Sequence, residues 1–159
     1  MANKTIYLIK YRTSSTQRAH FAIYVHEGAF PGKGILIHVV GAPMAGFQLE
    51  IKENYDLAAT LQQYTSHLLG QVPASSTAAI RQLASTVRPP GISQNFMAPV
   101  DGVNNKRCQE WTAEYVQLLV QRQFLNQTAR QILQSERDPP AFGIGLNPVG
   151  RGRGRGRGN

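Results

Sequence analysis

The chain is poor in cysteine. It has 159 residues and a single cysteine, Cys108, so no disulfide can form within one chain. Without a disulfide, nothing in the sequence requires an oxidising compartment. A chain of this length can bury enough surface to fold as one domain around its own core. We therefore expect one domain that needs neither a disulfide nor a metal ion for stability.

Long apolar runs are also missing. Near the N-terminus, a short apolar run from Ile6 to Ile9 is followed directly by Lys10, which is too short for the apolar region of a signal peptide. No stretch approaches the ~20 apolar residues that a transmembrane helix needs. We expect a protein without a signal peptide or a transmembrane segment, located in the cytoplasm or in the nucleus.

Acidic residues are few, and none follows Asp138. The chain has 17 basic and 9 acidic residues, a formal net charge of +8. Four of the positive charges lie in a strict Arg-Gly alternation near the C-terminus: Arg151, Arg153, Arg155 and Arg157. The high isoelectric point is therefore weak evidence for a basic face on the folded part. Residues 141–159 bury too little apolar surface to offset chain entropy, so we expect a disordered tail.

The Arg-Gly tail is a candidate for weak RNA contact. Guanidinium groups pair with phosphates and stack on bases, and glycine keeps the backbone adaptable. A tail with four arginines predicts weak, salt-sensitive binding. The alternative interpretation is a solubilising tail, or a site of arginine methylation, that has no specific partner.

The first third of the chain is predicted to form β-strands. Residues 5–11 are rich in β-branched and aromatic residues. Residues 20–25 and 47–52 alternate between apolar and polar, as a half-buried strand does, and residues 35–40 form a nearly continuous apolar run. Because the last three segments are joined by short connections, we predict an antiparallel β-meander.

The rest of the chain is predicted to be largely helical. Asp56 is a good N-cap for a helix over residues 57–69, and Gly70 fits its end. The apolar stripe of this helix would be Leu57, Leu61, Tyr64 and Leu68. Further helices are expected at residues 76–85, at 108–123 and from Asn126 to Asp138. The fold class is thus α+β, an antiparallel β-meander packed against helices over residues 1–140.

Cys108 opens one of these helices, and two histidines lie in the strand segments. A helix N-terminus favours the thiolate and lowers the thiol pKa. A nearby histidine can take the thiol proton and return it to a leaving group, and a third group must fix the tautomer of that base. We predict that Cys108 is a nucleophile, that His20 is its base and that His38 orients His20.

Other groups of the predicted site are less specific. The first N–H groups of the cysteine helix are candidate oxyanion donors, and Tyr24 and Gln109 are candidate contacts to the substrate or the oxyanion. No cofactor is expected. No pair of histidine and cysteine residues has metal-ligand spacing on one element, so no zinc site is expected either. The alternative for Cys108 is a small buried hydrophobe, and for the histidines a satisfied place in the core.

At these residues the chain resembles a known family, the circularly permuted papain-like thiol enzymes of the NlpC and lecithin:retinol acyltransferase type, and within it a fungal branch. The matching segments, in the order of the permuted family, are His20-Phe21-Ala22-Ile23-Tyr24-Val25, Gly34-Ile35-Leu36-Ile37-His38-Val39 and Cys108-Gln109-Glu110-Trp111. The resemblance covers roughly residues 5–137. It implies a permuted papain-like α+β fold with the cysteine helix packed on an antiparallel sheet. It also implies acyl chemistry through a thioester on a small acyl or peptide substrate.

Two functions follow from the sequence. The first is a thiol-dependent hydrolase or acyltransferase that acts on an amide or ester. The alternative is a non-catalytic papain-like interaction domain whose Arg-Gly tail binds RNA or a protein partner. Arg107, at a position where the acyltransferase branch has asparagine, favours the alternative, as does the tail itself. A purely structural Cys108 is the third interpretation.

Overall fold

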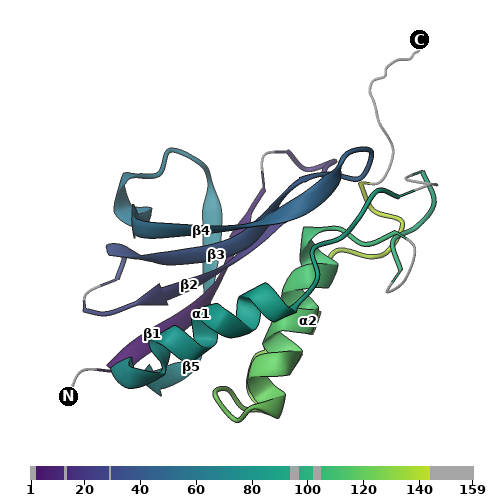
Figure 1. Ribbon diagram of the computed structural model, residues 1–159. Coiled ribbons are helices and arrows are strands. Elements are labelled where there is room, and N and C mark those ends of the chain that lie inside the picture. The colour runs from purple at the N-terminus through teal and green to yellow at the C-terminus, as the bar shows by residue number, and fades with distance from the viewer. Residues whose placement is uncertain (1–2, 13, 29, 94–96, 102–104, 144–159) are drawn as a thin grey trace.

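The fold is built on a five-stranded antiparallel sheet with the strand order β4-β3-β2-β1-β5. The computed structural model describes residues 3–12, 14–28, 30–93, 97–101 and 105–143. The strands are β1 (Asn3–Tyr11), β2 (His20–His26), β3 (Lys33–Ala42), β4 (Gly46–Asp56) and β5 (Tyr64–Pro73). The first four strands form a meander, and β5 returns to pair with the free side of β1 (Figure 1). The predicted antiparallel meander is therefore confirmed.

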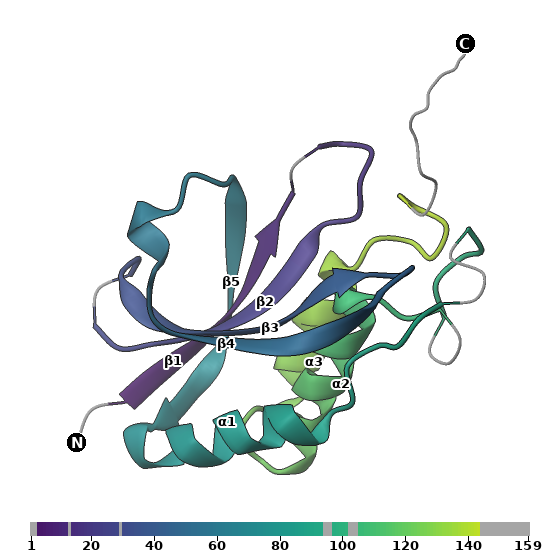
Figure 2. The same ribbon diagram turned by 45° about the horizontal axis from the view of Figure 1, so that its top comes forward.

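Helices cover one face of this sheet (Figures 1 and 2). They are α1 (Thr77–Thr86), α2 (Cys108–Gln121) and α3 (Gln127–Glu136), and two short 3-10 turns, η1 (Leu57–Ala59) and η2 (Ala74–Ser76), precede β5 and α1. Trp111 and Tyr115 of α2 are fully buried against the sheet. Their polar atoms are satisfied, because Trp111 donates to the carbonyl of Val87 and Tyr115 to that of Ile80. The main core thus lies between the sheet and the helices.

The opposite face of the sheet carries a second, aromatic-rich cluster. Its buried members are Ile9, Tyr11, Ala22, Tyr24, Leu36 and Leu57. Alternation along β2 sends Phe21, Ile23 and Val25 into the main core and the intervening side chains to this second face. Since both faces of the sheet are covered, β2 is buried almost throughout, from Phe21 to its end.

The predicted helix over residues 57–69 is wrong. That segment begins with η1 and continues as β5, which pairs with β1 along its whole length. The proposed apolar stripe does not exist, because Leu61 is 100% exposed and Leu68 is 54% exposed. Pairing with the open edge of β1 overrides the local helical pattern, as tertiary context commonly does.

The other helices lie where the sequence predicts them, and the α+β class is confirmed. Ala129 and Leu133 of α3 are buried in the main core, so the ordered fold continues beyond α2. Residues 144–159, with the tail arginines, lie outside the described residues. Among the residues that are described, no helix is long and apolar enough to cross a membrane.

Candidate active site at the start of α2

Cys108 is the first residue of α2 and lies beside the start of β2. Its thiol donates to the carbonyl of Ala19, with 3.8 Å between Sγ and O, and the backbone of Phe21 also hydrogen-bonds to the sulfur. The sulfur is therefore next to the peptide units that flank His20. The folded chain brings the predicted nucleophile and the strand of its predicted base together.

The thiol is in a protonated resting state. Burial raises the pKa of Cys108 to about 11, although backbone hydrogen bonds from Phe21 and Gln109 favour the thiolate. The expected lowering of the thiol pKa by the helix N-terminus is therefore wrong, because desolvation outweighs the N–H groups that surround the sulfur. Taken over the whole residue, Cys108 is half-buried.

The rings of His20 and His38 are directly hydrogen-bonded. His20 Nε2 and His38 Nδ1 are 2.7 Å apart, and the rings meet edge to face. Burial, helped by the neighbouring His38, lowers the pKa of His20 to about 4, and burial also lowers the pKa of His38. The predicted contact between base and orienting residue is present. In the described part of the chain, no hydrogen bond joins the thiol to either imidazole.

A third residue, Glu50, extends this pair. Its Oε1 lies 2.7 Å from His38 Nε2, and Glu50 is the register partner of His38 in the β3–β4 hairpin. We call the set Glu50, His38 and His20 the histidine chain. Sequence reasoning missed Glu50, but a signal existed: it lies on the polar side of an alternating strand, opposite His38 in a short hairpin.

The histidine chain admits one consistent placement of protons. An ionised Glu50 can only accept, so His38 Nε2 carries a hydrogen and His38 Nδ1 is an acceptor. His20 Nε2 must then donate to His38 Nδ1. This leaves His20 Nδ1 without a hydrogen, as a basic nitrogen. His20 lies at the start of β2, and the thiol contacts the backbone of the neighbouring Ala19. The arrangement is suited to removing a proton from a nearby donor.

The residues matched by a protein-family model include Cys108 and the histidine chain. A model of a family of unknown function, DUF6540, matches residues 6–126. The chain belongs to this family. The DUF6540 match runs from β1 to just beyond α2 and so includes Cys108 and the whole histidine chain. No curated protein and no solved structure matches the chain.

A buried polar network holds the start of α2 in this DUF6540 chain. The Gln109 side chain donates to the carbonyl of Ala19 and to Asp138, and it accepts from the backbone N–H of Asp138. Asp138 also accepts from the backbone N–H of Ala19 and from Arg12. Burial alone would raise the pKa of the Asp138 carboxyl, but these hydrogen bonds lower it below its usual value. Through these hydrogen bonds, Gln109 connects the start of α2 with the segment before β2 and with the segment after α3.

The same network neutralises a buried carboxylate. Glu110 is 3% exposed and forms ion pairs with Arg18 and Arg137, at 3.0 and 2.9 Å. It also accepts from the backbone N–H of Arg107, one of the otherwise unpaired donors at a helix N-terminus. These contacts fix the first turn of α2 and with it the position of Cys108.

Both predicted side-chain contacts to the oxyanion or substrate are engaged elsewhere in the structure. Tyr24 is four residues along β2 from His20, about 13 Å at the rise of an extended strand, and its hydroxyl donates to the carbonyl of Gly32. Gln109 is fully buried, and both groups of its amide are occupied by the polar network. Its role is to position α2. Among the described residues, no group of three or more potential ligands could hold a metal ion.

Proposed function

We propose that this DUF6540 chain is a thiol-dependent hydrolase or acyltransferase that acts on an amide or ester through a thioester on Cys108. The observation that carries the proposal is the histidine chain, which ends in a basic nitrogen at the same strand end that contacts the thiol. A carboxylate, two ordered imidazoles and a thiol at a helix start form the set of groups that nucleophilic catalysis uses.

In the proposed reaction, the Cys108 sulfur attacks the carbonyl carbon of the substrate. The thiol proton passes to His20 Nδ1, and Glu50 stabilises the resulting imidazolium through His38. His20 then gives this proton to the leaving amine or alcohol, and the acyl group stays on sulfur. Water or an acyl acceptor next attacks the thioester while His20 again accepts a proton, and its return to sulfur restores the thiol.

The resting site is a neutral thiol with neutral imidazoles. The pKa of about 11 for Cys108 and of about 4 for His20 disfavour a preformed thiolate–imidazolium pair at neutral pH. Proton transfer must therefore accompany attack on the carbonyl. Because thiol and ring are not hydrogen-bonded to each other, the proposal requires that side-chain rotation bring them together when substrate binds, as in sites whose catalytic contacts tighten in the complex.

The test is acylation by p-nitrophenyl acetate. The wild-type chain should release p-nitrophenol in a burst and carry an acetyl group on Cys108, detected by intact-mass and peptide spectrometry. Cys108→Ser should abolish the adduct, and His20→Asn should slow acylation by about 10²–10⁴-fold, the usual contribution of a general base. Acylation no faster than that of free cysteine, and unaffected by His20→Asn, would contradict the proposal.

Glu50 should act as a positioning residue. Glu50→Gln preserves the size of the side chain but replaces a carboxylate, which can only accept hydrogen bonds, with an amide that can also donate. The tautomers of His38 and His20 are then no longer fixed, so acylation should slow at least about tenfold. The matched control is Glu53→Gln on the same strand, where the carboxylate pairs with Arg81 at the surface. Unchanged kinetics and an unchanged pH profile in Glu50→Gln would remove Glu50 from the mechanism.

The second candidate function is a non-catalytic interaction domain with an RNA-binding tail. The burial of the thiol and its raised pKa favour it. It predicts that a fluorescent oligouridylate binds the full chain in low salt and not a chain that ends at residue 143. Equal binding by both chains would exclude a role for the tail arginines.

A further inference from the structure

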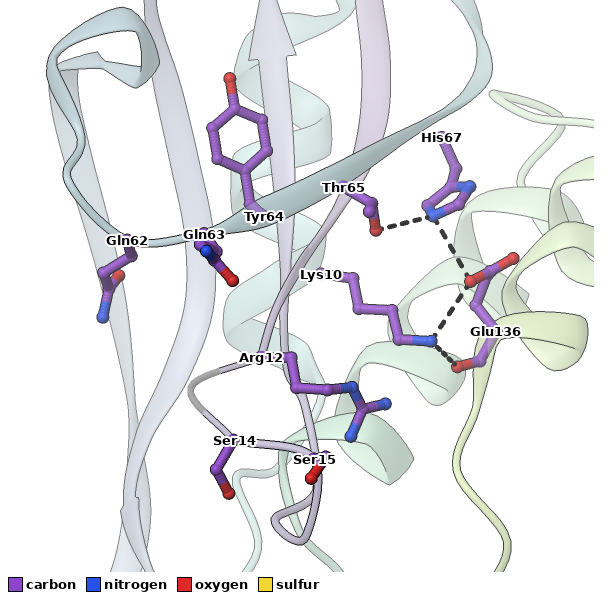
Figure 3. Close-up of a pocket in the computed structure, with 10 residues that line it drawn as sticks. All are labelled: Lys10, Arg12, Ser14, Ser15, Gln62, Gln63, Tyr64, Thr65, His67 and Glu136. Carbon is purple, nitrogen blue, oxygen red and sulfur yellow. Dashed lines mark hydrogen bonds and ion pairs between the residues drawn. The ribbon is translucent and has the colours of Figure 1, made fainter.

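A pocket lies apart from the thiol, at the edge of the sheet (Figure 3). It has a volume of about 800 Å³ and is bounded by the end of β1, the segment after it, the start of β5 and the end of α3. This volume falls within the range of about 300–1,000 Å³ that is usual for small-molecule sites. Neither Cys108 nor any member of the histidine chain lines it.

One wall of the pocket is a connected group of donors and acceptors. Lys10 Nζ donates to the backbone carbonyl of Glu136, at 3.0 Å, and to its carboxylate, at 3.3 Å. His67 Nε2 lies 3.4 Å from the same carboxylate and 3.1 Å from the hydroxyl of Thr65. Figure 3 shows these four side chains converging from β1, β5 and α3. The two contacts to the Glu136 carboxylate, at 3.3 and 3.4 Å, are longer than usual, so an incoming polar group can share or replace them.

The remaining lining consists of the aromatic side chain of Tyr64, four neutral polar side chains and one paired cation. The neutral groups are the hydroxyls of Ser14 and Ser15 and the carboxamides of Gln62 and Gln63. All four residues are exposed. Hydroxyls and carboxamides each offer both a donor and an acceptor. The cation, Arg12, already donates to Asp138 and to the carbonyl of Gln17, both at 2.7 Å.

Charge balance decides which ligand suits this lining. With histidine counted as neutral, the charges of Lys10 and Arg12 are matched by Glu136 and Asp138. An anionic ligand would have to displace a carboxylate and would then meet it as a neighbouring like charge. A hydroxyl group both donates and accepts, so it can bind between Lys10 and Glu136 without separating their charges. The pocket therefore favours a neutral ligand with many hydroxyl groups.

We propose that this pocket binds a short neutral oligosaccharide. The ligand hydroxyls bind the Lys10, Glu136, His67 and Thr65 wall, and the carboxamide of Gln63 contacts the opposite side. The volume exceeds a single sugar ring, and the exposed rim leaves room for a chain to enter and leave. The site is separate from the proposed thiol chemistry and does not depend on it.

The test is a titration of the ¹⁵N-labelled full chain, followed by amide chemical shifts. The probes are the trisaccharides of a glycan array, including chitotriose, cellotriose and maltotriose, with inorganic phosphate as the anion probe. We expect saturable shifts at Lys10, Thr65, His67 and Glu136 with at least one trisaccharide and none there with phosphate. The Cys108→Ser variant should bind equally well, which separates this result from the fate of the thiol proposal.

Variants make the assignment specific. Lys10→Met removes a charged donor and should weaken trisaccharide binding about tenfold or more. Gln63→Ala changes an exposed side chain just before β5 and should weaken binding without affecting folding. Gln71→Ala, on β5 and outside the pocket, should leave the affinity unchanged. Saturable phosphate binding at these residues, or no shift with any trisaccharide of the array, would overturn the proposal.

Discussion

Burial sets the protonation states of the two central side chains. Burial keeps both the Cys108 thiol and the His20 imidazole neutral. The helix N-terminus favours the thiolate of Cys108, and the carboxylate of Glu50, linked to His20 through His38, favours the imidazolium of His20. Desolvation opposes any charged form, so it prevails over these partial charges. In the proposed reaction, charge would therefore have to be created as the thiol attacks.

The pH dependence of stability should reveal His20. Its pKa is about 4 in the folded chain and 6.5 ordinarily, so on acidification the unfolded chain takes up the proton first. The stability that neutral His20 supplies is complete above about pH 6.5 and is lost as the pH falls towards about 4, by on the order of 3 kcal/mol. Urea unfolding across this window should show a shallower loss for His20→Asn than for the wild type. Identical pH slopes would contradict the assignment.

The role of a single residue was predictable where it depends on the residue type and on its order in the sequence. It was not predictable where it depends on contacts with residues that are distant in the sequence. The contact between His20 and His38 was predicted, because strand pairing places their rings together. Glu50 was missed because its role comes from its register opposite His38. The place of Gln109 in the polar network was not predicted, because sequence does not show that Asp138, far along the chain, occupies its amide.

At the scale of elements, the first turn of α2 is held by polar contacts rather than by apolar packing alone. Gln109 bridges Ala19 before β2 and Asp138 after α3, so one side chain joins three segments. Because these hydrogen bonds are buried or part-buried, removal of the Gln109 side chain leaves donors and acceptors unsatisfied.

Gln109→Ala should therefore reduce the free energy of unfolding by about 2–3 kcal/mol, the usual cost of breaking a buried hydrogen-bond network. It should also speed the reaction of Cys108 with iodoacetamide, since the start of α2 is no longer fixed against β2. Chemical denaturation and labelling kinetics measure the two effects. Gln117→Ala, an exposed position of the same helix, is the control, and equal stability of the two variants would refute this role.

The misassigned segment 57–69 shows the limit of local patterns. Its apolar residues have helical spacing, but Leu57 lies in η1, Leu61 lies before β5, and only Tyr64 and Leu68 of the predicted stripe are in the strand. The free edge of β1 offers backbone hydrogen bonds along a full strand, and this gain decides between the two structures.

At the scale of the whole molecule, α3 belongs to the fold although the DUF6540 match ends at residue 126. Ala129 and Leu133 are buried in the main core, and the segment after α3 supplies Asp138. The family unit is thus completed in this chain by a helix that covers the same face of the sheet as α2.

A chain that ends at residue 126 should lose its cooperative fold. Truncating one buried leucine costs about 2–5 kcal/mol, and losing a whole helix approaches the ~5–15 kcal/mol total stability of a domain. A chain that ends at residue 143 keeps every described contact and is the control. Near-ultraviolet circular dichroism from buried Trp111 and a thermal scan distinguish them, and a cooperative transition in the shorter chain would be the contrary result.

Local chemistry along the chain determined the antiparallel meander and most helices, because alternation, capping residues and residue type are local properties. Tertiary structure alone decided the strand β5, the place of Glu50, the occupied amide of Gln109 and the neutral resting thiol. Each of these depends on which groups are excluded from water together, and that is set only when distant segments pack.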